Sequence, residues 1–169
     1  QDLLYLFAAD GTAVSMPVYQ LPQARAMGVG KHFAEMTGFS RRRHLADALV
    51  VPNDAEGSIV LTTVAGMVKR ARLDDLPGIT SEPFTVIGVA KNDALGWAKL
   101  SANDGEVMLA TSQGRLIRFD ETAVREMGLP AAGVMGVKLS GETDGVVAME
   151  ILTPEIVAQN PYIWSITDN

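Results

Sequence analysis

The sequence predicts an all-β protein built from propeller-like repeats, and two observations support that prediction. A strand, a glycine turn and a second strand occur three times, around Gly11, Gly66 and Gly114. These glycines are 55 and 48 residues apart, and a period of about 50 residues with strand-like units is typical of repeating β architectures. The composition agrees, because 16 glycines and 8 prolines with 6% aromatic residues suit short strands joined by tight turns.

Each repeat is expected to begin with a β-hairpin. An apolar first strand runs into the turn, and the three segments are Leu4–Gly11, Ile59–Gly66 and Val107–Gly114. A second strand leaves each turn, at Thr12–Met16, Met67–Arg72 and Arg115–Phe119. Glycine supplies the positive φ that tight hairpin turns need. Helices are disfavoured here by the β-branched and short polar residues, so three hairpins are predicted, with Leu6, Leu61 and Leu109 in the core.

Two further short strands are expected in the second and third repeats, which gives about four strands per repeat, the size of a propeller blade. They are Phe84–Val89 with Leu95–Leu100, and Gly133–Leu139 with Gly145–Leu152. The first repeat is longer, with residues 39–44 inserted before a strand at 49–51. In the third, residues 121–128 are expected to form one or two helical turns that end at Gly128.

The repeats therefore make one partial domain, 1–169. Its blades cover about 1–55, 56–103 and 104–155, and the start of a fourth lies at 156–169. The last segment, Tyr162–Asn169, reads like another first strand. Three blades and the start of a fourth indicate an excerpt of a longer chain.

The charge of the chain is unevenly distributed. The net charge is −6, and residues 104–169 carry four basic and ten acidic side chains whereas the rest is balanced. A nucleic-acid domain is usually basic overall, so any phosphate-binding surface here must be a local stripe.

Several classes of site and segment are not expected. The chain has no cysteine, and His32 and His44 follow no metal-binding pattern, so no metal or other cofactor is expected. No apolar run approaches the ~18–20 residues of a membrane span and no signal peptide is recognisable, which favours a cytoplasmic protein without a membrane partner.

The third repeat carries a resemblance to a known family. Residues 107–119, then Glu126-Met127-Gly128, then 132–139 and 144–150 closely resemble the repeat in the C-terminal domain of the A subunit of DNA gyrase and of its topoisomerase IV counterpart. The second repeat agrees at 66–70. The resemblance implies a β-pinwheel whose positively charged rim binds and bends double-stranded DNA. It also implies two protein partners, the ATPase subunit of the enzyme and the remainder of the A subunit. In that family the cleavage chemistry is located elsewhere, so this domain is expected to be non-catalytic.

The candidate DNA contacts follow from the chemistry of the DNA backbone. Closely spaced phosphates are bound without sequence preference by Lys and Arg set along their path. Four residues after the hairpin glycines stand Ser15, Arg70 and Arg118, a position that blades around an axis would present along one curved edge. The candidate DNA-binding residues are Lys69, Arg70, Arg72, Arg115, Arg118, Arg25, Arg41, Arg42 and Arg43. The alternative is that such charges only keep a strand face soluble.

A second functional hypothesis is a degenerate propeller that serves protein interaction or structure without DNA binding. The acidic last third supports it, as do Phe84 and Ala132, which stand where the family usually has an arginine. Glu121 and Glu126 are interpreted as solvated turn residues that, with Asp120, weaken the third blade as a DNA contact. Open blade edges at both ends also suggest self-association.

Overall fold

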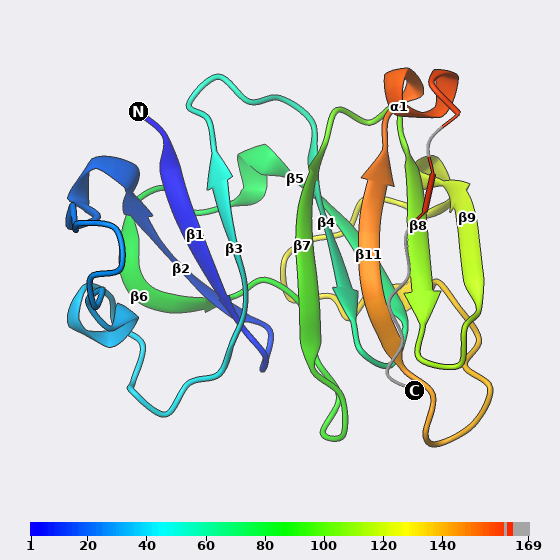
Figure 1. The fold of residues 1–169 in the computed structure, drawn as a ribbon, viewed down its shortest axis with the longest axis horizontal. Helices are drawn as coiled ribbons and strands as arrows, with labels where there is room; N and C mark the ends of the chain where they lie inside the picture. The colour runs from blue at the N-terminus through cyan, green and yellow to red at the C-terminus, as the bar shows by residue number, and fades with distance from the viewer. Residues whose placement is uncertain (161, 164–169) are drawn as a thin grey trace.

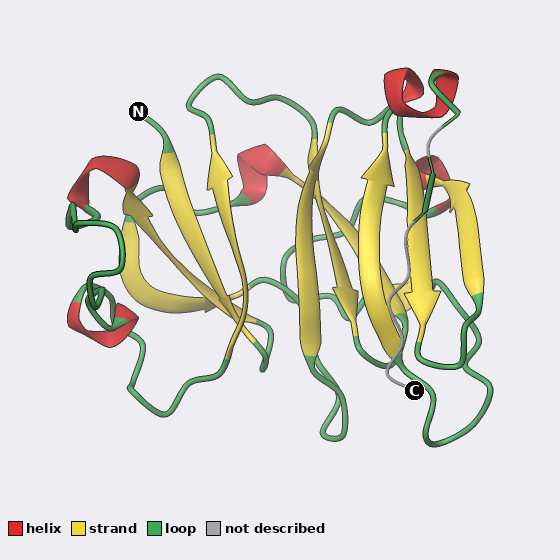
Figure 2. Cartoon of the chain, in the orientation of Figure 1, coloured by secondary structure: helices red, strands yellow, loops and turns green. Residues whose placement is uncertain are grey.

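The computed structural model describes residues 1–160, 162 and 163, and this part of the chain is almost wholly β (Figure 2). Its eleven strands form three antiparallel sheets that stand side by side (Figure 1). In order across each sheet, the first contains β3 (Leu45–Val51), β1 (Leu3–Ala8), β2 (Thr12–Pro17) and β6 (Thr80–Thr85). The second contains β10 (Val134–Met135), β5 (Met67–Arg72), β4 (Ser58–Thr63) and β7 (Leu95–Ser101). The third contains β11 (Val146–Leu152), β8 (Glu106–Thr111) and β9 (Leu116–Asp120).

In the residues that the structure describes, helical structure is confined to short segments at the ends of strands and in connections. The 3₁₀ turns are η1 (Val18–Gln20), η2 (Phe33–Glu35), η3 (Leu73–Asp75) and η4 (Glu121–Ala123), and α1 covers Pro154–Ala158. Of the helices in the described residues, none is long and apolar enough to span a bilayer. The all-β, propeller-like prediction is confirmed.

The three predicted hairpins are present, as β1–β2, β4–β5 and β8–β9. Their turns place Gly11, Gly66 and Gly114 at φ values of 82°, 89° and 73°, the region that favours glycine. At Gly11 space is limiting as well, because a Cβ there would lie 2.2 Å from the carbonyl oxygen of Ile87. The turn of the first hairpin therefore packs directly against the segment that follows β6.

Strand membership differs from the prediction of four strands within each repeat. β6 follows β5 in sequence but pairs with β2 of the preceding sheet, with Thr12 opposite Thr85. β10 in turn leaves the third repeat and pairs with β5. Each of these strands thus completes the sheet before its own, as Figure 1 shows for β6 beside β2. The third sheet receives no such strand from the described residues.

The boundaries of the exchanged strands also differ from the prediction. β6 begins at Thr80 and ends at Thr85, because Val86 and Ile87 turn into the core between the first two sheets. Pro83 is tolerated in β6 since an edge strand can leave one backbone donor position empty. The expected helical turns at 121–128 shorten to η4, because the backbone N–H of Met127 donates to the carbonyl oxygen of Arg70 at 2.9 Å.

Strand alternation produces two inter-sheet cores. In β4, Ile59 and Leu61 pack toward the first sheet whereas Val60 packs toward the third. Side chains alternate between faces along a strand, so one central strand serves both cores. Tyr5 belongs to the first core together with Ile59 and Leu61, and Leu109 belongs to the second together with Val60.

The two outer faces of the array differ. Leu4 and Leu6 on the outer face of the first sheet are covered by the segment between β2 and β3, through Phe33 and Phe39. On the third sheet, Leu116 is 57% exposed. The expected fourth-repeat strand at 162–169 is not tested, because Tyr162 and Ile163 belong to no strand and positions 161 and 164–169 lie outside the described residues.

Candidate nucleic-acid interface

The position four residues after the hairpin glycine lies between sheets in the first two repeats. Ser15 is paired with Tyr5 in the first sheet, and Arg70 is paired with Val60 in the second. Paired residues point to the same face of their sheet, so each of these two side chains points toward the next sheet in the array. Ser15 is 3% exposed and the Arg70 side chain 11% exposed. Arg118 is 57% exposed only because no described sheet covers it. The expected curved edge of exposed side chains at this position is therefore not formed.

Arg70 meets a buried carboxylate from the next repeat. The Asp120 carboxylate accepts hydrogen bonds from the backbone N–H of Thr122 at 2.8 Å and from its hydroxyl, which begins η4 directly after β9. This turn directs Glu121 toward the second sheet. Its Oε1 accepts hydrogen bonds from Ser101 Oγ at 2.6 Å and from the Gly105 backbone N–H at 2.7 Å.

The second carboxylate oxygen of Glu121 lies 4.0 Å from Nη1 of Arg70. Glu121 is fully buried, so its interpretation as a solvated turn residue is wrong. The only sequence signal for Glu121 was its position, three residues after Arg118 and at the start of a turn.

Lys69, a predicted DNA contact, is also fully buried. Its Nζ donates hydrogen bonds to the carbonyl oxygen of Val86 at 2.8 Å and to that of Leu129. Burial lowers the pKa of Lys69 to about 8. The ammonium joins the segment after β6 to the segment before β10, and it is out of reach of a phosphate on the surface.

Arg72 and Arg118 are exposed but paired with neighbouring acids. Arg72 contacts Asp75 at 2.8 Å, and this hydrogen bond together with the charge of Asp75 raises the pKa of the guanidinium. Arg118 contacts Glu106 at 2.8 Å, an acid that was not among those expected to weaken the third blade as a DNA contact. Exposed pairs of this kind are worth about 0–1 kcal/mol, so a phosphate can replace the carboxylate at small cost.

The arginines of the insertion divide into paired and unpaired side chains. Arg41 pairs with Glu35, and Arg43 pairs with Asp10 while its guanidinium lies 5.6 Å from the centre of the Phe39 ring. Arg42 is exposed and forms no ion pair with the described residues. The triple arginine therefore presents one fully available guanidinium and two that are held by acids.

Arg25 and Arg115 are exposed, and neither forms an ion pair with the described residues. Arg115 follows the β8–β9 turn directly. Sequence reasoning did not select four further exposed basic residues that share these properties: Lys31, Lys91, Arg125 and Lys138. Arg125 had a usable signal, since it stands beside the Met127-Gly128 pair of the repeat.

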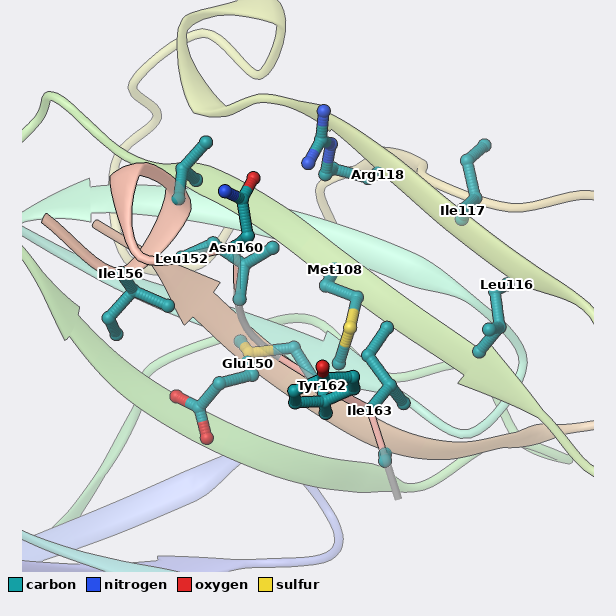
Figure 3. Close-up of a pocket in the computed structure, with 13 residues that line it drawn as sticks. Met108, Leu116, Ile117, Arg118, Glu150, Leu152, Ile156, Asn160, Tyr162 and Ile163 are labelled. Carbon is teal, nitrogen blue, oxygen red and sulfur yellow. The ribbon is translucent and has the colours of Figure 1, made fainter. Parts of the chain in front are cut away.

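An apolar groove of about 790 Å³ lies along the uncovered face of the third sheet. Figure 3 shows the side chains that line it, with Met108, Leu116 and Arg118 from the sheet and Tyr162 from the segment after α1. Arg118 thus borders an apolar surface. In the described part of the chain, no three His, Asp or Glu side chains are grouped so as to hold a metal ion.

Comparison with known proteins identifies the family. The sequence profile described as "DNA gyrase C-terminal domain, beta-propeller" matches residues 2–38, 57–81 and 105–153. The chain is 32% identical over 166 residues to the A subunit of DNA gyrase from Salmonella typhimurium, covering 95% of this chain and 19% of that one. It is 28% identical over 165 residues to the A subunit of DNA gyrase from Mycobacterium leprae, covering 96% and 12%.

A solved structure agrees with these relatives. The crystal structure of the C-terminal domain of DNA topoisomerase IV superposes with a TM-score of 0.78 at 30% identity, covering 90% of this chain and 47% of that one. The chain thus spans less than a fifth of the gyrase subunits that it matches and about half of that domain. By sequence and by fold, the chain belongs to the family of DNA gyrase C-terminal β-propeller domains.

Proposed function

We propose that this chain binds double-stranded DNA through its backbone, without sequence preference, and bends or wraps it as part of a gyrase-type A subunit. The observation that supports the proposal is the family match, which includes part of each of the three repeats. In this role the domain breaks no bonds itself. It acts in the bacterial cytoplasm with the ATPase subunit of the enzyme and the rest of the A subunit, where it supports DNA supercoiling.

The proposed contacts are those predicted arginines whose side chains reach the surface. Arg25, Arg42 and Arg115 offer guanidinium groups without an acidic partner among the described residues, and Arg41, Arg43, Arg72 and Arg118 can exchange a surface carboxylate for a phosphate. Lys69 and Arg70 are left out, because the first is fully buried and the second is only 11% exposed, so neither can follow a DNA backbone. Bending a site of 20–30 base pairs costs about 1–6 kcal/mol, so several phosphate contacts must act together.

Replacing Arg115 with Glu tests the proposal. Fluorescence anisotropy with a duplex of about 40 base pairs is measured over a series of salt concentrations. We expect binding that weakens steeply with salt. The Arg115→Glu variant should bind more weakly, and the slope of log K against log salt should become shallower by about 0.9, the loss of one phosphate contact.

The charge-matched control is Lys91→Glu, which changes an exposed lysine outside the proposed contacts by the same two charge units. It should leave the slope unchanged. Equal losses in both variants would indicate only a general charge effect. Absence of binding by the unaltered chain at low salt would refute DNA binding by these blades and favour the protein-interaction module that the acidic last third suggests.

A further inference from the structure

The contact between Arg70 and Glu121 joins two different sheets. Arg70 belongs to β5 of the second sheet, and Glu121 begins η4 at the end of the third. Ser101, which ends β7, supplies the hydroxyl donor to the carboxylate. One side chain of the third repeat is thereby held by two strands of the preceding sheet.

The environment of this carboxylate demands a counter-charge. Glu121 Oε2 and Arg70 Nε are buried and have no hydrogen-bond partner among the described residues. A buried ionised carboxylate is costly unless a cation or donors compensate it. Oε1 has two donors, whereas the charged group that faces Oε2 is the guanidinium of Arg70 at 4.0 Å.

The same positions in the preceding pair of sheets carry an uncharged pair of residues. Seven residues after its hairpin glycine, the second repeat has buried Leu73 where the third has Glu121. Four residues after its glycine, the first repeat has Ser15 where the second has Arg70. A charge on one sheet thus accompanies a charge on the next, and the uncharged Ser15 accompanies the uncharged Leu73.

We propose that Glu121 is a positioning residue: its carboxylate, neutralised by Arg70, fixes the third sheet against the second, and Arg70 serves this contact instead of DNA. Backbone contacts hold the same segment, because Met127 N–H donates to Arg70 O. The side chains therefore set the angle between sheets that are already docked. The consequence for DNA, that this angle sets its path, rests on the proposed function, whereas the contact itself does not.

A double-mutant cycle measures the contact. Arg70→Met, Glu121→Gln and the double variant are unfolded in urea, beside the matched cycle of Arg72→Met and Asp75→Asn, an exposed pair in the same part of the chain. The Arg70–Glu121 coupling should change the unfolding constant at least about tenfold, whereas an exposed pair should change it less than about fivefold. Glutamine keeps an acceptor for Ser101 and Gly105, which favours folding of the variant. Equal coupling in the two cycles would overturn the proposal.

The positioning role has its own readout. The chain has no cysteine, so spin labels can be attached at introduced cysteines, one pair at Val64 and Gln113 across the second and third sheets and a control pair at Ala48 and Val64 across the first and second. Glu121→Gln should shift or broaden the distance distribution of the first pair alone. Unchanged distributions in both pairs would refute the role in positioning.

DNA binding separates the two roles of Arg70. If the proposal holds, Arg70→Met leaves the salt slope unchanged, while Arg115→Glu makes it shallower. A slope that becomes shallower by about 0.9 in Arg70→Met would place Arg70 on a phosphate and overturn the assignment. If the unaltered chain binds no DNA, the proposed function fails, and the unfolding cycle and the label distances still judge the contact.

Discussion

At the scale of single residues, burial rather than residue type decides what the basic side chains can do. Ser15, Arg70 and Arg118 occupy one sequence position, yet only Arg118 is accessible, because no described sheet covers its face. Sequence spacing located the position but not its surroundings. Whether this side chain is buried depends on whether another sheet packs on its face. That is a property of the assembled sheets, and no local sequence pattern predicts it.

Lys69 offers a test at this scale. Lys69→Met removes the donor shared by the carbonyl oxygens of Val86 and Leu129, so it should lower the free energy of unfolding by about 1–3 kcal/mol at pH 7. Urea unfolding monitored by circular dichroism measures the change. A variant as stable as the original chain would show that these carbonyls do not need the ammonium.

The pH dependence of stability is a second readout for Lys69. Its folded pKa is about 8 and its unfolded value 10.5, so between these values the unfolded chain binds more protons than the folded one. Stability from this group therefore rises from about pH 8 to pH 10, because the penalty for burying the charge disappears. Lys69→Met should lack that rise.

At the scale of strands, the hairpins could be predicted because their signals are local. Gly11, Gly66 and Gly114 mark turns that require a positive φ, and apolar runs define the strands before them. The exchanged strands could not be assigned in the same way. β6 and β10 carry ordinary strand sequences, and nothing within them states whether they pair with their own hairpin or the preceding one.

Strand alternation predicts unequal effects for two leucines. Leu61→Ala in β4 empties a fully buried site between the first and second sheets and should cost about 2–5 kcal/mol. Leu116→Ala in β9 changes a side chain that is 57% exposed and should cost less than about 1 kcal/mol. Urea unfolding of both variants provides the comparison. Equal costs would mean that the uncovered face of the third sheet is covered in solution.

At the scale of the whole molecule, the exchange of β6 and β10 makes the sheets interdependent. Unfolding the second repeat removes β6 from the first sheet, and unfolding the third removes β10 from the second. We therefore expect one cooperative thermal transition, with equal calorimetric and van't Hoff enthalpies. Separate transitions would show that the exchanged strands contribute little to the coupling.

The exchange of β6 also governs how such a protein can be divided or shuffled. A gene segment that ends between two repeats, near residue 56, carries three strands of a sheet and leaves its fourth behind with the neighbour. Recombination at repeat boundaries would thus join strands from two ancestors within one sheet. A graft that keeps the first sheet complete must take residues 1–51 together with 80–85, which are not contiguous in the gene. The unit that folds and the unit that is inherited are offset by one strand.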